Sequence, residues 1–357
     1  MIEFYFEHCS LHTVVGMKKV GVLTLFMLIA IVVFPVSVGC VEETRIEDAV
    51  KYLLHHYDDE IDLIFESEER AEHFLKEQYP NLPLTFQNVF WLYTDNYFAC
   101  LALAPYSPYH SSRIKGRLEN FGFRSNLYEV INGENFDIVR HGNIIYIGNF
   151  SNKYIFSLIH NGSEFDDFDA YADLCLYYAL NCFFKSDLPE AEKYFQKAYK
   201  MFDGKGLKDK AFIEAGYYAN YKLALLLYAS RVMGIELPNY GEIESLLWSK
   251  QSENGGIVSL SDPEGNPIGS ANCETTSLTL LVYNDELIKS LSEKILDRKP
   301  KISESSLIIA AFSISLLLIL LLKKIRLKRV FSHFIARLWK TVILGGRNCL
   351  NPSFLSR

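Results

Sequence analysis

The sequence predicts a mainly α-helical protein with a small inserted β meander and one C-terminal transmembrane helix. Three observations support this fold class. Apolar residues recur at helical spacing through most of the stretch 41–305, a segment rich in β-branched and aromatic residues interrupts that spacing at about 136–159, and the segment 306–322 is apolar without a single charge. We therefore expect one large helical domain beside a membrane anchor.

Residues 1–39 have the pattern of an upstream extension followed by a secretory signal peptide. The basic segment 17–19 precedes an apolar run at 20–33, and small residues lead to an expected cleavage after Gly39. Residues upstream of this run fit no export signal, so the true start is either Met1 or Met17. Cys40 leaves attachment of a lipid as an alternative.

The C-terminal part of the chain predicts a membrane anchor. The segment SLIIAAFSISLLLILLL at 306–322 is at the short end of the ~17–25 residues that cross a hydrocarbon core. Lysines and arginines follow it directly, which indicates that the basic tail 323–357 lies in the cytoplasm. The chain is thus predicted to be a single-pass protein of the cell membrane, with its bulk extracytoplasmic.

The predicted extracytoplasmic domain is acidic. It carries 25 basic and 41 acidic side chains between residues 41 and 305. Because like charges would have to be brought together, this balance argues against nucleic acid and other anionic polymers as partners. The basic tail, in contrast, is suited to anionic lipid headgroups.

Four cysteines, Cys100, Cys175, Cys182 and Cys273, lie in the predicted exported domain. An oxidising exterior permits disulfides among them, with three pairings open. Cys175 and Cys182 are too far apart along one helix to bridge each other. Free buried thiols are the alternative.

The predicted elements follow one another with proline or glycine at nearly every junction. Thr44 and Glu47 form a capping box that starts the first helix. The segment FDIVRHGNIIYIGNFSNKYIFSLI at 136–159 is predicted as strands joined by short turns. Further helices are predicted at 67–77, 86–104, 107–121, 167–184, 189–202, 208–233, 240–252 and 271–284.

The stretch QSENGGIVSLSDPEGNPIGSANCETTS at 251–277 is the least ordinary part of the chain. Gln251-x-x-x-Gly255-Gly256-Ile257 is followed by a glycine-bearing loop, and Asn272-x-Glu274-Thr275-Thr276 then opens an apolar helix. This pattern resembles one helical hairpin of an α/α-toroid, the fold of six-hairpin glycosidases, some polysaccharide lyases, terpenoid cyclases and prenyltransferases. The segments 91–103 and 201–234 are similar. About nine predicted helices, against twelve in a full six-hairpin barrel, imply an incomplete toroid.

The resemblance implies that the inner ends of the helices converge on one polar mouth, where carbohydrate is recognised or cleaved. Cleavage of an acetal needs one protonated and one ionised carboxyl group. The resemblance suggests Glu274 as the acid and Asp95 as the base or water-orienting group, with Asp173 and Lys205 also at the mouth. The residues implied to bind substrate are Asn96, Asp203, Tyr217, Lys222, Trp248, Gln251, Asn254 and Asn272.

Structural roles are open for the same residues. Asp95 could cap a helix, Glu274 could stabilise a helix N-terminus through the dipole, and Lys222 could extend along the edge of the core. If the protein is an enzyme, the resemblance implies activity like that of a glycoside hydrolase or polysaccharide lyase.

A non-catalytic scaffold is the alternative function. The segment 172–202 resembles one tetratricopeptide unit, with small and aromatic positions on two helices around the turn 186–189. Such repeats bind a protein or peptide partner, but a working array needs about three or more units. The sequence shows one.

The acidic segment DDEID at 58–62 has the D-D-x-x-D spacing of magnesium–diphosphate sites. In so acidic a domain, a solvated face is the better interpretation. Cysteine and histidine pairs lack zinc-site spacing, and the sequence contains neither a nucleophile elbow nor a phosphate-binding loop. We therefore predict no metal and no cofactor.

Overall fold

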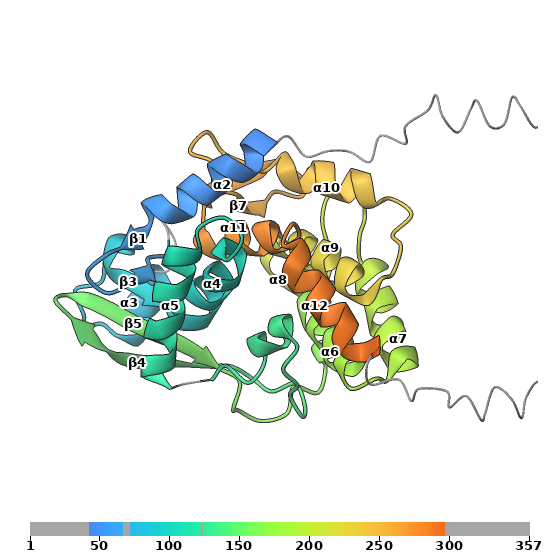
Figure 1. Ribbon diagram of the computed structural model, residues 1–357, viewed down its shortest axis with the longest axis horizontal. Coiled ribbons are helices and arrows are strands. Elements are labelled where there is room, and N and C mark those ends of the chain that lie inside the picture. The colour runs from blue at the N-terminus through green and yellow to red at the C-terminus, as the bar shows by residue number, and fades with distance from the viewer. Residues whose placement is uncertain (1–42, 67–71, 123, 297–357) are drawn as a thin grey trace, which may run out of the picture. The chain divides into compact units, whose positions relative to one another are not determined.

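The computed structural model describes residues 43–66, 72–122 and 124–296 (Figure 1). The described residues up to Lys294 belong to one compact unit. The predicted signal peptide (1–39), transmembrane helix (306–322) and basic tail (323–357) lie outside the described residues and stay predictions. Within the described part, every helix falls short of the length and hydropathy that a membrane span requires.

Four helices form an inner layer. Neighbours contact each other in the order α4 (Phe98–Leu103), α11 (Cys273–Leu281), α9 (Tyr221–Met233) and α6 (Ala172–Phe184). Buried residues occupy nearly the whole circumference of these helices, because protein covers every side. In α9, for example, every residue from Lys222 to Ser230 is buried.

Four amphipathic helices cover this inner layer. α5 (Pro108–Phe121) contacts α4, α2 (Glu43–His55) contacts α11, α10 (Tyr240–Trp248) contacts α9, and α7 (Leu188–Tyr199) contacts α6. In Figure 1, α2 and α10 run along the top of the view, above α11 and α9. Each outer helix buries one stripe only, which in α7 consists of Ala191, Phe195 and Ala198.

The remaining helices are short or lie at the end of the described chain. They are α3 (Glu72–Gln78), α8 (Lys210–Ala215) and α12 (Asp285–Leu296). The described residues thus contain eleven α-helices, and the mainly α-helical class is confirmed. The predicted helices at 107–121, 189–202 and 240–252 correspond to α5, α7 and α10.

Three small sheets accompany the helices. β4 (Asn143–Phe150) and β5 (Lys153–Ile159) form an antiparallel hairpin, and β3 (Val89–Trp91) pairs with β5 in parallel. β6 (Tyr218–Ala219), β7 (Val258–Ser261) and β8 (Pro267–Ala271) form an antiparallel sheet. The two-residue strands β1 (Tyr57–Asp58) and β2 (Leu63–Ile64) pair with each other.

The structure corrects the predicted β meander at 136–159. This segment supplies only the hairpin β4–β5, and the third strand of its sheet is β3, which lies inside the predicted helix 86–104. Val89 pairs with Tyr154, a residue far along the chain. Local periodicity carries no information on such a partner, so the helical prediction for Val89–Trp91 was wrong.

The predicted helix 208–233 is also interrupted. α8 ends at Gly216, which takes the left-handed conformation with φ of 76° and closes the helix through its N–H to the carbonyl of Phe212. The chain then forms β6 before α9 begins. The break occurs because Tyr218 and Ala219 pair with β7.

A π-helical segment, η2 (Leu92–Tyr97), joins β3 to α4 and carries the fully buried Asn96. The side chain of Asn96 accepts from the N–H of Ile64 at 2.6 Å and donates to the carbonyls of Ile64 at 2.9 Å and Trp91 at 2.7 Å. These bonds satisfy backbone groups that the short strands leave open. Asn96 therefore ties β2 and β3 to the start of α4.

We expect Asn96→Ala to lower the free energy of unfolding by about 3 kcal/mol, because each buried backbone group left without a partner costs about 1–3 kcal/mol. Urea unfolding measures the change. Asn120→Ala, at an exposed position of α5, is the matched control and should shift stability by less than about 0.5 kcal/mol. Equal shifts in the two variants would contradict this role.

Candidate active site

The inner helices bring their N-terminal ends together. Asp173 lies in the first turn of α6, Tyr221 in the first turn of α9 and Glu274 in the first turn of α11. The hydroxyl of Tyr221 donates to Oδ2 of Asp173 at 2.6 Å, and Asp173 is close enough to Glu274 to raise its pKa. Asp95, in η2, lies just before α4. Polar side chains of four elements therefore converge at one end of the inner layer.

Local sequence explains the position of Glu274. Asn272 caps α11, and its side chain accepts from the N–H of Thr275 at 2.8 Å. Glu274 follows in the first turn, where the helix dipole favours a carboxyl group. The backbone N–H of Cys273 donates to the carbonyl of Glu66 at 3.2 Å, which brings the end of β2 alongside this turn.

Three carboxyl groups, those of Glu66, Asp95 and Glu274, form what we call the carboxyl cluster. Burial first, and then the charges of Glu66 and Glu274, raise the pKa of Asp95 well above its ordinary value. Burial, Glu66 and Asp173 raise the pKa of Glu274 to about 8. Burial raises the pKa of Glu66 to about 7, although the indole N–H of Trp91, 2.5 Å from Oε2, works in the opposite direction. The cluster therefore holds protons near neutral pH.

Solvent contact differs within the carboxyl cluster. Asp95 is 2% exposed, and among the described residues its Oδ2 has no hydrogen-bond partner. Glu66 and Glu274 are half-buried and keep some contact with solvent. Glu274 thus combines a retained proton with access from outside.

Asp173 has the opposite protonation state. Burial works against its charge, but the ammonium group of Lys222 and the hydrogen bond from Tyr221 lower the pKa of Asp173 below its ordinary value. Nζ of Lys222 lies 3.3 Å from Oδ1 of Asp173 and 2.5 Å from Oδ2 of the buried Asp209. Two neighbouring carboxyls, Asp173 and Glu274, are thus driven to different states, which is typical of acid–base pairs.

Tyrosines line the same region. The rings of Tyr128 and Tyr177 lie 5.6 Å apart between centroids, and the buried hydroxyl of Tyr177 has no hydrogen-bond partner within the part of the chain that the structure describes. Burial and the nearby charges of Glu274 and Asp173 raise the pKa of Tyr128 and Tyr221 well above the ordinary value. These phenols therefore stay neutral and can act as hydrogen-bond donors.

The predicted site residues divide into two sets. The structure brings Glu274 and Asp95 together, and Lys222 joins them through Asp173. Glu66, Tyr128, Tyr177 and Tyr221 were missed, because no motif surrounds them and only tertiary contacts place them at the site. Asp173 was expected at the mouth, although it was not singled out for a catalytic role.

The other predicted residues take part in local structure. Asn96 forms hydrogen bonds with backbone groups, among them the carbonyl of Ile64, and Trp248 donates from Nε1 to the hydroxyl of Tyr283 at 2.6 Å. Asp203 accepts from the hydroxyl of Tyr218 at 2.5 Å. Tyr217 is half-buried between α8 and β6. Their substrate-binding roles, like that of the capping residue Asn272, stay predictions.

The glycine turn at the start of the stretch 251–277 is explained by packing. Gln251 donates to the carbonyls of Arg45 at 2.8 Å and Gly255 at 2.9 Å, and Asn254 accepts from the N–H of Gly256 at 3.1 Å. Gly255 has φ of 90°, and a Cβ there would meet the carbonyl oxygen of Asp48 in α2. The turn thus lets α2 approach closely.

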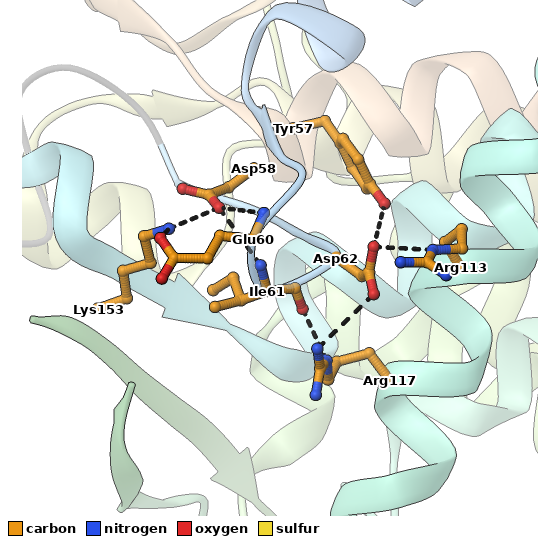
Figure 2. Close-up of polar contacts among 8 residues, drawn as sticks. All are labelled: Tyr57, Asp58, Glu60, Ile61, Asp62, Arg113, Arg117 and Lys153. Atoms are coloured by element: carbon orange, nitrogen blue, oxygen red, sulfur yellow. Dashed lines mark hydrogen bonds and ion pairs between the residues drawn. The ribbon is translucent and has the colours of Figure 1, made fainter. Parts of the chain in front are cut away.

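The acidic segment 58–62 lies on the turn between β1 and β2, not on a helix (Figure 2). Asp58 accepts from Nζ of Lys153 at 2.7 Å, which also approaches Glu60. Asp62 accepts from Nε of Arg113 at 2.9 Å and lies 3.6 Å from Arg117. The basic side chains of α5 and β5 therefore neutralise two of the three carboxylates, Asp58 and Asp62, that the D-D-x-x-D spacing would offer to magnesium.

Within the described residues, no group of three or more acidic, histidine or cysteine side chains has a geometry that could hold a metal ion. Cys100, Cys175, Cys182 and Cys273 are free and buried, which corresponds to the alternative of free thiols. Burial is the main reason why the pKa of the Cys100 thiol is raised and why that of Cys175 is raised to about 12. These thiols are therefore not activated nucleophiles.

Comparison of the chain with protein-family models, with curated proteins and with solved structures found no match.

The raised pKa of Glu274 predicts a specific dependence of stability on pH. The ordinary value is 4.5 and the folded value is about 8, so unfolding releases a proton between these two pH values. The free energy of unfolding then falls as pH rises, by up to about 1.4 kcal/mol per pH unit. Glu274→Gln removes this contribution. In urea unfolding at pH 5, 7 and 9, the free energy of unfolding of the variant should therefore increase relative to that of the wild type as pH rises. Glu253→Gln, at an exposed position, should show the same pH dependence of the free energy of unfolding as the wild type.

Loss of the buried ammonium group should be costly. We expect Lys222→Met to lower the free energy of unfolding by about 3–5 kcal/mol, since Asp209 and Asp173 would lose their shared counter-charge. Lys193→Met, which removes a surface pair with Glu190, is the control and should leave the unfolding midpoint nearly unchanged. Similar midpoints for both variants in thermal unfolding would refute the importance of the Lys222 pairs.

Proposed function

We propose that the protein cleaves glycosidic bonds by general acid–base catalysis at Glu274 of the carboxyl cluster and the neighbouring Asp173. The single observation that carries this proposal is the pair of neighbouring carboxyls with opposite protonation states, Glu274 with its proton and Asp173 without. Hydrolysis of an acetal requires such a pair. Carbohydrate at the outer face of the cell membrane is the proposed substrate class.

In this mechanism, Glu274 donates its proton to the glycosidic oxygen of the leaving group. Asp173 stabilises the positive charge that develops on the sugar ring or activates the water that attacks it. Tyr221 and Lys222 hold Asp173 in place and keep it ionised. Asp173 thereby takes the role that the sequence suggested for Asp95.

Glu66 acts on Glu274, and both Glu66 and Glu274 act on Asp95. Asp95 is nearly inaccessible, and burial favours its protonated form, which makes it unsuitable as a base. The negative charge of Glu66 helps to keep the proton on Glu274 at neutral pH. Glu66 is therefore a positioning residue in the proposed mechanism.

The arrangement of the helices supports an incomplete α/α-toroid. Inner helices α4, α9 and α6 each contact an outer helix that follows directly in sequence, namely α5, α10 and α7. α11 lies between α4 and α9 and completes the row. An inner layer of this kind, with its polar residues gathered at one end, is what the resemblance to toroid enzymes implies.

Hydrolysis is favoured over elimination by a polysaccharide lyase. Elimination acts on acidic sugars, whose carboxylate would approach a site already rich in carboxyl groups within an acidic domain. A neutral sugar meets no such repulsion. We therefore propose neutral glycans as substrates.

The alternative of a tetratricopeptide-like scaffold rests on the hairpin of α6 and α7. Repeat proteins bind partners on a concave surface formed by successive exposed helices. Ten of the thirteen residues of α6 are buried, so this helix offers little surface to a peptide. This favours the enzymatic proposal.

A hydrolysis screen tests the proposal. The purified full-length protein is incubated with neutral and acidic polysaccharides, and reducing ends are measured. We expect turnover on a neutral glycan that falls at least about 100-fold in Glu274→Gln and in Asp173→Asn, with Glu253→Gln unaffected. The rate should also decline above about pH 8 as Glu274 loses its proton.

Two outcomes would overturn the proposal. One is turnover that persists in Glu274→Gln while circular dichroism shows both proteins folded. The other is the absence of turnover on every glycan tested, which would favour a binding protein.

A further inference from the structure

A depression of about 310 Å³ lies where the segment 135–140 meets the residues that follow β5. This volume is at the lower end of small-molecule sites, which span about 300–1,000 Å³. It suits a ligand with the size of one sugar ring. The polar side chains that line it are Asn126, Asn135, Asp137, Arg140, His160 and Asn161.

The lining is rich in groups that both donate and accept hydrogen bonds. Each of the three asparagines offers a carbonyl oxygen and an NH₂ group. One carboxylate, Asp137, and one guanidinium, Arg140, balance each other in charge, and NH1 of Arg140 already donates to the carbonyl of Gly162 at 3.1 Å. This balance favours a neutral ligand that carries many hydroxyl groups over a phosphate or a carboxylate.

Several lining groups are fixed in advance. Oδ1 of Asn161 accepts from Nδ2 of Asn143 at 2.7 Å, so the NH₂ group of Asn161 is left as a donor. Asn126 has φ of 67°, a left-handed conformation that asparagine adopts more readily than most residues other than glycine.

His160 forms the buried wall of the depression and is 8% exposed. Its backbone N–H donates to the carbonyl of Ser125 at 2.7 Å, and its ring Nδ1 lies 3.2 Å from Oγ of Ser125. The imidazole ring contacts the ring of Tyr128 edge-on, with 5.0 Å between the centroids. Burial lowers the pKa of His160 to about 4, so the imidazole is neutral at physiological pH. The buried Phe136 adds an apolar face to this wall.

We propose that this depression is a binding site for one neutral monosaccharide unit, held by the asparagine side chains and His160. The site uses none of the residues of the carboxyl cluster. It can therefore bind sugar whether or not the protein cleaves glycans.

Saturation-transfer difference NMR on the full-length protein tests the proposal, in a detergent without a sugar headgroup. The probes are glucose, galactose, mannose and N-acetylglucosamine, with glucuronate and glucosamine as charged controls. We expect saturable binding of at least one neutral sugar. The variants Asn126→Gly, which tolerates the left-handed backbone, and Asn135→Ala should raise its Kd at least about tenfold.

Two further variants separate this site from the carboxyl cluster. Asn120→Ala, on the exposed face of α5, should bind as the wild type does. Glu274→Gln should also retain binding. Loss of binding in Glu274→Gln, unchanged binding in both Asn126→Gly and Asn135→Ala, tighter binding of a charged sugar, or no saturable binding of any neutral sugar would each overturn the proposal. The proposed hydrolase activity is tested separately, because the hydrolysis screen measures turnover and not binding at this depression.

Discussion

The structure depends on an inner layer of helices that have no solvent face. α4, α6, α9 and α11 are buried around nearly their whole circumference because amphipathic helices cover them, and their N-terminal ends meet inside the protein. The first turns of these helices still carry polar side chains. The outer helices that bury the apolar residues therefore also exclude water from the carboxyl groups at the N-terminal ends of the inner helices.

These buried carboxyl groups are stabilised in two different protonation states. Asp173 remains ionised because Lys222 supplies a counter-charge and Tyr221 a hydrogen bond. For Glu274 and Asp95, burial and the negative charges of neighbouring carboxyl groups favour the protonated forms. Unsatisfied or protonated carboxyls reduce stability, and proteins retain them chiefly at functional sites. The proposed acid and its ionised partner follow from this asymmetry.

Local features of the fold could be predicted from the sequence to different degrees. The helix opened by Asn272 and Glu274 was recognised because capping is encoded within four residues. The break at Gly216 and the strand Val89–Trp91 were not, because each depends on pairing with a strand distant in the chain. At the site, Glu274 and Asp95 were identified through a resemblance. Glu66 was not, because it stands outside any motif.

The sequence by itself determined the helical class, the apolar helices that must be buried and the acidic character of the domain, since composition and periodicity act locally. Only the tertiary structure decided which carboxyl is protonated. A pKa depends on burial and on charges a few ångströms away, and these come from segments that are far apart in the chain, such as those of Glu66 and Glu274. The acid–base pair is therefore a property of the fold and not of any single stretch of chain.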